Sequence, residues 1–246
     1  MSEYPLNVQS LMIPYSECYQ KAGRFSTEFK TVSGKFPHIQ CAAVLADSLK
    51  ELRESIDIPD GQSDYITGVR IGYGLDKQNE IVLYFSPLYG VLPPGPGTGS
   101  VVKFDLSETS GDFLKVIERA DHKVYEVEGE RLVNIMDEED RKARALGNLL
   151  RYRSDILITT PGGERPWNDT DVKSIFFPFQ EIQALQDMYG EDRIYFISGL
   201  EEENSMAVHT IILSHLNPHD VSHAADKVAN MANMCPPQCG SVVFAL

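Results

Sequence analysis

The residue types best suited to metal or catalytic chemistry gather near the carboxyl end of the sequence. Four of the six histidines and two of the four cysteines lie within the last 38 residues: His209, His215, His219, His223, Cys235 and Cys239. His219 and His223 are four residues apart at the start of a predicted helix, which would place both imidazoles on one face about 5–6 Å apart. With Cys235 and Cys239 they are the candidate ligands of a zinc or other transition-metal site.

The spacing of these residues departs from known metal signatures. Cys235 and Cys239 flank a Pro-Pro-Gln turn, and no second pair with regular spacing accompanies them. The two thiols could instead form a reversible disulfide, although their spacing is not the Cys-x-x-Cys of thioredoxin-like enzymes. Polar histidines at the surface and buried thiols explain the same residues without any ligand. Metal, redox and structural roles therefore stay open.

A second candidate site is the loop that follows a predicted strand at 156–160. Gly162 and Gly163 would let backbone amides approach a ligand, and a helix expected after the loop would direct its N-terminus toward an anion. Arg165 and Trp167, the only tryptophan, would add a charge and a flat surface. The loop lacks the Lys-Ser or Lys-Thr pair of nucleotide-binding loops, and its acidic residues also suit a plain connection with a capping side chain. Ligand binding and a structural turn are both compatible with it.

No complete catalytic signature is present in the chain. It contains no Gly-x-Ser-x-Gly, no Gly-x-Gly-x-x-Gly, no His-Glu-x-x-His and no EF-hand loop. Catalytic residues are therefore left unassigned.

The charge of the chain is strongly negative and uneven. The formal net charge is −14, and residues 154–246 hold 13 acidic residues against 4 Lys plus Arg. Such a surface repels a nucleic-acid backbone. The arginines of 137–153 could be read as a nucleic-acid stripe, but charge runs on helices are usually solvated faces. The acidic part favours either a solubilising surface or recognition of a basic protein or a cation.

Composition and length indicate an ordinary globular protein. The chain has 246 residues and 42% hydrophobic residues, enough for one hydrophobic core or two closely packed halves. No charged leader precedes an apolar run, and no stretch approaches the roughly 18 apolar residues of a membrane span. We expect a cytoplasmic protein with reduced cysteines and no membrane partner.

Periodicity predicts the elements of the first half. Apolar residues at helical spacing predict a helix over 38–56: Ile39, Ala42, Leu45, Leu49, Leu52 and Ile56. Strands at 65–73 and 81–85 around a polar connection predict a hairpin. The Pro/Gly-rich segment 91–100 is a loop that could link two halves or lie over a cleft. A strand at 101–106 and a short helix at 112–120 follow.

The second half shows a similar mixture. A hairpin is predicted at 125–127 and 132–135, then a helix over 137–153 with acidic residues at its start and arginines at its end. A strand at 156–160 precedes a helix that ends near Tyr189, before Gly190. Strands at 194–198 and 208–214 follow, and Asn217-Pro218 opens a last helix that ends near Met234.

One internal similarity links the two halves. The segment 74–79, Gly-Leu-Asp-Lys-Gln-Asn, resembles 199–204, Gly-Leu-Glu-Glu-Glu-Asn, and each lies in a helix-strand-strand order. The spacing of about 125 residues could record a duplication, or the match could be chance between two hairpins.

These patterns together predict an α+β fold. We expect an antiparallel or mixed sheet from several hairpins, packed with about four to five helices. It would form one compact domain over 1–246, or two packed halves at about 1–90 and 101–246.

The expected function is that of a binding or protein-interaction module. It would act through the acidic C-terminal third and the Gly162-Gly163 loop, on a protein partner or a small molecule. The alternative is a metal-dependent enzyme, a hydrolase, whose site is the His/Cys cluster at the carboxyl end.

Overall fold

The computed structural model describes residues 12–32, 34–35, 40–58, 60–61, 65–91, 115–117, 123–160, 163–166, 174–203, 206–219, 227–229 and 233–235. This part holds four helices and sixteen strands. The helices are α1 (Tyr15–Glu28), α2 (Ala46–Glu54), α3 (Glu139–Asp155) and α4 (Phe179–Tyr189).

The strands of the first half are β1 (Met12–Pro14), β2 (Phe29–Thr31), β3 (Gly34–Lys35), β4 (Cys41–Leu45), β5 (Tyr65–Leu75), β6 (Ile81–Val91) and β7 (Lys115–Ile117). Those of the second half are β8 (Tyr125–Glu128), β9 (Arg131–Asn134), β10 (Ile156–Thr160), β11 (Gly163–Pro166), β12 (Ser174–Pro178), β13 (Arg193–Glu203), β14 (Met206–Ser214), β15 (Lys227–Ala229) and β16 (Asn233–Cys235).

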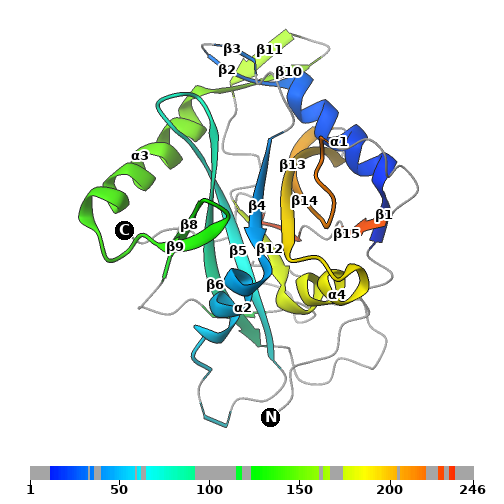
Figure 1. The fold of residues 1–246 in the computed structure, drawn as a ribbon. Coiled ribbons are helices and arrows are strands. Elements are labelled where there is room, and N and C mark those ends of the chain that lie inside the picture. The colour runs from blue at the N-terminus through cyan, green and yellow to red at the C-terminus, as the bar shows by residue number, and fades with distance from the viewer. Residues whose placement is uncertain are drawn as a thin grey trace.

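The strands form three antiparallel sheets. One has the order β1-β15-β14-β13-β4, and a small one has the order β11-β10-β2-β3. The largest has seven strands, with the order β16-β12-β5-β6-β8-β9 and β7 paired to β6. Figure 1 shows the long β5–β6 hairpin and the curved β13–β14 hairpin side by side in the middle of the molecule, with helices around them. The α+β prediction with antiparallel hairpins is therefore confirmed.

The two long hairpins exchange partners with distant segments. β4 pairs with β13, and β12 pairs with β5. The helices follow the same exchange, since α1 packs against β13 and α3 packs against β5. Strands β2 and β10, which follow α1 and α3 directly, pair with each other. The fold thus depends on contacts between residues more than 100 positions apart.

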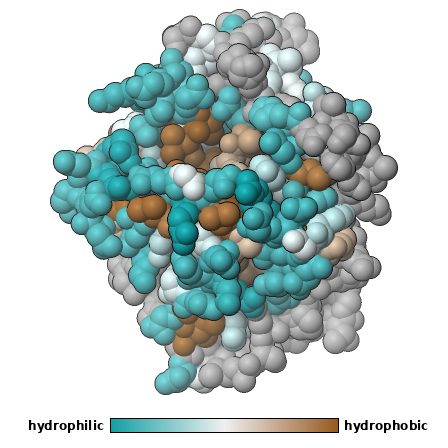
Figure 2. Space-filling model, in the orientation of Figure 1, coloured by the Kyte–Doolittle hydropathy of each residue, from teal (hydrophilic) through white to brown (hydrophobic). Residues whose placement is uncertain are grey.

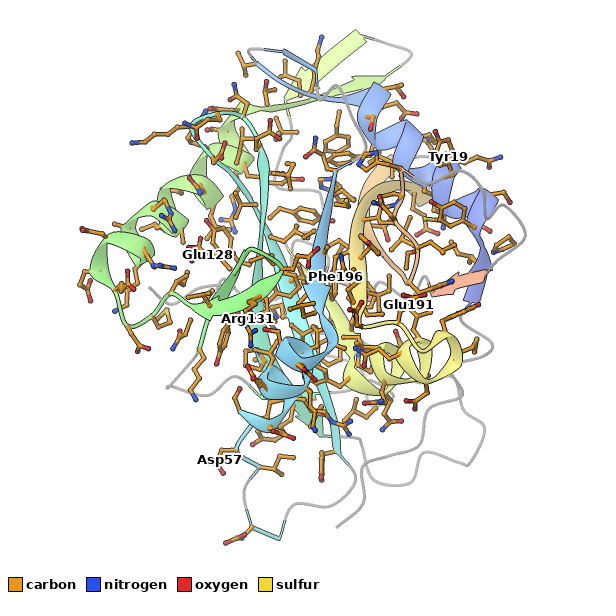
Figure 3. The ribbon with its side chains drawn as sticks, in the orientation of Figure 1. Tyr19, Asp57, Glu128, Arg131, Glu191 and Phe196 are labelled. Atoms are coloured by element: carbon orange, nitrogen blue, oxygen red, sulfur yellow. The ribbon has the colours of Figure 1, made fainter. Side chains whose placement is uncertain are left out.

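A single large cluster of buried side chains joins these elements. It contains Phe25 of α1, Leu52 of α2, Tyr152 of α3 and Ile182 of α4 together with strand residues. Figure 3 shows one of them, Phe196 of β13, in the interior between the strands. The face seen in Figure 2 is mainly hydrophilic, with separate hydrophobic spots.

The predicted helix over 38–56 is only partly correct. Residues 41–45 form β4, and the helix α2 begins at Ala46. The backbone of β4 pairs with 193–197 of β13, and Val44 enters the core. Pairing with a distant strand therefore overrides the local helical pattern in this stretch. The apolar face predicted at Leu49 and Leu52 is buried as expected.

Two further helix predictions are wrong where the structure describes them. Residues 115–117, inside the predicted helix 112–120, form β7 and pair with β6. Residues 218–219 form a turn, and 227–229 and 233–235 form short strands instead of the last helix. The sequence prediction also missed α1.

Several other predictions are confirmed. The hairpins β5–β6, β8–β9 and β13–β14 and the helix α3 lie where the patterns place them. The helix before Gly190 ends as predicted, with Gly190 in the left-handed region at φ 68°, but it begins at Phe179 after strand β12. The predicted strand at 101–106 and the loop at 92–100 lie outside the described residues, so the division into two halves stays a prediction. Within the described part, no helix is long and apolar enough to span a membrane.

Candidate functional site

A groove of about 740 Å³ lies between α3, the turn of the β5–β6 hairpin and strand β8. Helix α3 contributes one face to it: Asp140, Ala143, Arg144, Gly147, Asn148 and Arg151. The turn contributes Asp76, Lys77 and Gln78, and the strands contribute Val82 and residues 126–128. Two small residues in the helix face, Ala143 and Gly147, leave room in the groove. The space beside Gly147 is open, since a Cβ built there would meet no atom within 4 Å.

Local chemistry places α3 beside the groove. Glu139 and Asp140 in the first turn and Arg153 in the last turn complement the helix dipole. The buried face of the helix holds Ala145, Asn148, Leu149 and Tyr152, which anchor it against β5. The face of α3 that lines the groove lies next to this buried face and is turned toward β8 and the hairpin turn.

A buried carboxylate forms one wall of the groove. The side chain of Glu126 is only 7% exposed and accepts hydrogen bonds from Arg144 and, at 3.4 Å, from Arg141. Burial raises the pKa of Glu126, and the nearby Arg144 acts in the opposite direction. Arg141 also bonds Glu128 at 2.6 Å and Glu138 at 2.7 Å. Figure 3 shows Glu128 between the β8–β9 hairpin and α3.

A polar pair lies behind the groove. The Nδ2 amide of Asn148 donates to the hydroxyl of Tyr84 over 3.0 Å, and both residues are buried. Burial raises the pKa of Tyr84 to about 12, so the phenol is neutral at physiological pH. The neighbouring apolar lining comes from Val82 and Val127.

The hairpin turn is fixed to the helix by one arginine. Arg151 donates to the backbone carbonyl of Asp76, to Oδ1 of Asn79 at 3.0 Å and to Asp155 at 3.4 Å. The Asp76 carboxylate in turn accepts from the backbone amides of Gln78 and Glu80. These bonds hold the turn in place above the groove.

Two charged side chains in the groove have no partner in the described part of the chain. Neither Lys77 nor Asp140 forms a hydrogen bond or an ion pair there through its side chain. Arg144 bonds Glu126 through Nη2 and forms no other hydrogen bond in the described part of the chain, and its side chain is 51% exposed. The groove thus offers an ammonium, part of a guanidinium and a carboxylate to a ligand.

The three histidines described near the carboxyl end, His209, His215 and His219, lie in different surroundings. His209 is fully buried in β14, stacked between aromatic rings, and bonded to the hydroxyl of Tyr152. Burial holds its pKa well below the usual range, which marks a neutral core residue. His215 is buried and stacked on Tyr189 of α4 at 3.5 Å between ring centroids. Of the three histidines described in this region, His219 alone is exposed, in a turn in which its amide donates to Asn217.

The remaining predicted ligands are only partly described. Cys235 lies in strand β16 and faces Ser174 of β12 in the register, whereas His219 follows β14 of another sheet. His223 and Cys239 lie outside the described residues. Cys18 and Cys41 are free thiols, the first buried and the second exposed. Among described residues there is no group of three or more His, Cys, Asp or Glu that could hold a metal ion. The metal site and the hydrolase built on it stay predictions.

The glycine loop has a different context from the one predicted. Thr160 pairs with Gly163, so the loop joins β10 and β11 as an antiparallel hairpin and does not lead into a helix. Gly163 has φ 110°, a conformation that favours glycine. Arg165 lies in β11, while Gly162 and Trp167 lie outside the described residues. The helix N-terminus expected nearby belongs to Phe179 of α4, beyond β12. Ligand binding at this loop stays a prediction.

Sequence reasoning missed the groove, although it found the helix that lines it. The partners of Arg144 and Arg151 lie 18 and 75 residues away, and no local spacing reveals them. The available signal was the helix face with small residues at 143 and 147 between charges. Comparison with protein-family models, curated proteins and solved structures gave no match.

Proposed function

We propose that the protein is a binding module that takes a small zwitterionic ligand, an amino acid or a short peptide, in the groove beside α3. The observation that carries this proposal is the pair of unpartnered opposite charges in one groove, Lys77 on the hairpin turn and Asp140 on the helix. A ligand with both a carboxylate and an ammonium group satisfies both.

The carboxylate of the ligand fits the basic side of the groove. Lys77 supplies an ammonium, and Arg144 supplies N–H groups that its bond to Glu126 leaves unused. Because Glu126 fixes one end of the guanidinium, the donors are held in place before the ligand arrives. Charge-assisted hydrogen bonds of this kind are among the stronger polar contacts in proteins.

The ammonium group fits the acidic side. Asp140 is exposed in the first turn of α3, and Glu128 nearby keeps a side chain 47% exposed. Val82, Val127 and Ala143 provide apolar surface for the rest of the ligand. A volume of about 740 Å³ lies in the range usual for small-molecule sites.

The overall charge supports a ligand of low net charge. A chain with a formal charge of −14 repels polyanions at long range, whereas a zwitterion experiences little of that field. The proposal therefore narrows the predicted module to a small-molecule or peptide binder.

The test is a binding panel on the full chain, read by thermal shift and calorimetry. The panel holds the free amino acids and a set of dipeptides, each also in N-acetylated and C-amidated form. We expect at least one free zwitterion to bind and each capped form to bind about tenfold more weakly, equal to about 1.4 kcal/mol. A ligand at about 100 times its Kd would stabilise the fold by about 2.7 kcal/mol.

Matched variants assign the binding to the groove. Lys77→Met should weaken binding of the ligand with a free carboxylate and leave binding of its C-amidated form unaffected. Asp140→Asn should weaken binding of the ligand with a free amine and leave binding of its N-acetylated form unaffected. Lys123→Met and Asp60→Asn, both at exposed positions, are the controls. A panel without any binder, or binding that both groove variants leave unchanged, would show that the proposal is wrong.

We also infer that the chain arose by duplication of a unit of about 125 residues. The elements α1 through β6 run in the order of a helix, short strands and a further strand, a second helix and a long hairpin. The elements α3 through β14 repeat this order. The reciprocal pairing of β4 with β13 and of β12 with β5 supports this origin. In homologous sequences, the first half and the second half should be more similar to each other than shuffled sequences are. Relatives in which the halves are no more alike than shuffled sequences would contradict it.

A further inference from the structure

Helix α3 carries a second exposed face that neither the core nor the proposed ligand explains. Five residues at alternating spacings of four and three form it, here called the α3 stripe: Glu139, Ala143, Leu146, Leu150 and Arg153. All five are exposed, and the two leucines are 42% and 56% exposed. This spacing is that of the seam positions in a coiled coil.

The α3 stripe is distinct from the other two faces of the helix. The buried face holds Ala145, Leu149 and Tyr152, and the groove face holds Arg144 and Arg151. Ala143 alone belongs to both the stripe and the groove lining. Figure 1 shows α3 at the outer edge of the molecule, where another molecule could approach it. Two of the five large hydrophobic side chains exposed in the described part lie on this stripe.

We propose that the α3 stripe binds the same stripe of a second copy of this chain, with the two helices antiparallel about a two-fold axis. The two-fold axis passes beside Leu146, so Leu146 contacts Leu146 of the second copy. Leu150 then faces Ala143, so that a large residue packs on a small one at two symmetric places. Glu139 faces Arg153 at both ends.

Charge complementarity selects this partner and this orientation. The stripe is acidic at its N-terminal end and basic at its C-terminal end, with leucines between. An antiparallel pair therefore places opposite charges together twice, whereas a parallel pair would place like charges together. Glu139 also bonds Lys142 over 2.8 Å within the helix, but the Glu139 side chain is 89% exposed, so that bond hinders the new contact little. A self-complementary patch of this kind suits a two-fold homodimer.

The contact is small, so the dimer should be weak. One helix from each copy buries less than the area of about 1,000 Å² expected of a strong interface. We expect dissociation in the micromolar range or above, about 8 kcal/mol of binding or less.

The first experiment measures the mass of the full chain by sedimentation and light scattering across a concentration series from about 1 μM to 1 mM. The wild type should shift from monomer to dimer as its concentration rises. The double variant Leu146→Glu/Leu150→Glu should stay monomeric. Val32→Glu, at a residue 67% exposed and outside α3, is the matched control and should dimerise like the wild type. A wild type that is monomeric throughout, or a dimer that survives both leucine substitutions, would overturn the proposal.

Charge exchange tests the orientation. Glu139→Arg and Arg153→Glu should each weaken dimerisation about tenfold or more, because each brings like charges together. The double variant Glu139→Arg/Arg153→Glu should recover dimerisation close to that of the wild type. Failure of the double variant to recover would refute the antiparallel pairing, and circular dichroism of each variant checks that the helix is intact.

Disulfide trapping tests the register. Leu146→Cys should form a disulfide-linked dimer under mild oxidation, because the two sulfurs meet on the axis. Leu150→Cys should not, because its counterpart lies about two helical turns away. Unsubstituted protein controls for the native thiols, and rapid trapping through residue 150 with none through 146 would contradict the register.

Discussion

The imidazole of His209 lies parallel to the phenol ring of Tyr73, with 4.3 Å between the ring centroids and 7° between the ring planes. The hydroxyl of Tyr152 bonds the same imidazole at Nδ1, and the hydroxyl of Tyr73 donates to the carbonyl of Thr210 over 3.1 Å. Three elements, β5, α3 and β14, therefore meet at one buried histidine. Because His209 is buried in the core, its protonation affects the stability of the fold.

We predict that His209 makes the protein less stable as the pH falls below about 6.5. Burial lowers the pKa of His209 in the folded state, so the unfolded chain takes up the proton first, and protonation favours unfolding. The slope can reach about 1.4 kcal/mol per pH unit for a single group. Denaturant unfolding of wild type and His209→Phe between about pH 5 and pH 8 measures this slope.

The pH slope should be smaller in His209→Phe than in the wild type. His219→Phe is the matched control, because His219 is exposed on the turn after β14 and should keep the wild-type slope. Equal slopes in all three proteins would remove His209 as the cause.

Tyr152→Phe should destabilise the fold by about 1–3 kcal/mol, because the buried imidazole loses a hydrogen-bond partner. Adding His209→Phe removes both polar groups, so the double variant should lose less than the sum of the single losses. A double-mutant cycle from urea unfolding should give a coupling energy of at least about 0.5 kcal/mol. Strictly additive losses would mean that the two groups do not interact.

Glu181→Met should stabilise the protein at neutral and alkaline pH. Glu181 on α4 is fully buried, and neither carboxylate oxygen has a hydrogen-bond partner among the residues described. Burial raises the pKa of Glu181 in the folded state well above the usual range. The fold is therefore most stable with respect to this group below about pH 4.5, and that stability is lost as the pH rises through the folded-state pKa. We expect a gain of about 1–3 kcal/mol at pH 8 and a smaller one at pH 4.5.

Thermal unfolding at both pH values checks the Glu181 prediction. Asp187→Met on the exposed side of α4 controls for the general effect of removing a negative charge from a chain of net charge −14. A Glu181→Met variant that is less stable than wild type at both pH values would show that the carboxylate has a structural role.

Two glycine substitutions should have opposite effects. Gly23→Ala in α1 should stabilise the fold by about 0.5–1 kcal/mol, since a Cβ there meets no atom within 4 Å and alanine favours helix. Gly68→Ala in β5 should destabilise it by more than about 1 kcal/mol, since the Cβ would clash with the ring of Phe176 and lie 2.5 Å from the carbonyl oxygen of Phe177. Melting curves of the two variants decide, and a Gly68→Ala protein as stable as wild type would contradict the packing of β12 on β5.

Local pattern was sufficient where an element is defined by its own residues. The hairpin strands β5 and β6 combine β-branched and aromatic residues around a polar turn, and α3 has acids at its start and arginines at its end. Gly190 ended a helix as expected, because glycine adopts the left-handed conformation without a Cβ clash. The helix α1 was missed, although Tyr15, Cys18, Ala22 and Phe25 repeat at helical spacing on its buried face.

The predicted sites depended on more than local pattern. His209, His215 and His219 are close in the sequence, yet one enters the aromatic core, one stacks on α4 and one faces solvent. The α3 groove combines a turn near residue 77, a strand near 127 and a helix face at 140–151. No spacing rule connects these segments, because only the packing of α3 on β5 and the β6–β8 pairing bring them together.

The sequence by itself determined the fold class, the long hairpins, the strongest helix and the ends of several elements, because those depend on backbone preferences and on periodic burial. Only the tertiary structure decided that residues 41–45 are a strand, because β13, about 150 positions later, supplies the hydrogen bonds for their backbone. It also decided which charges are paired and which stay available in the groove. A charge is paired or free according to what lies within a few ångströms of it, and that distance is set by the packing of distant segments.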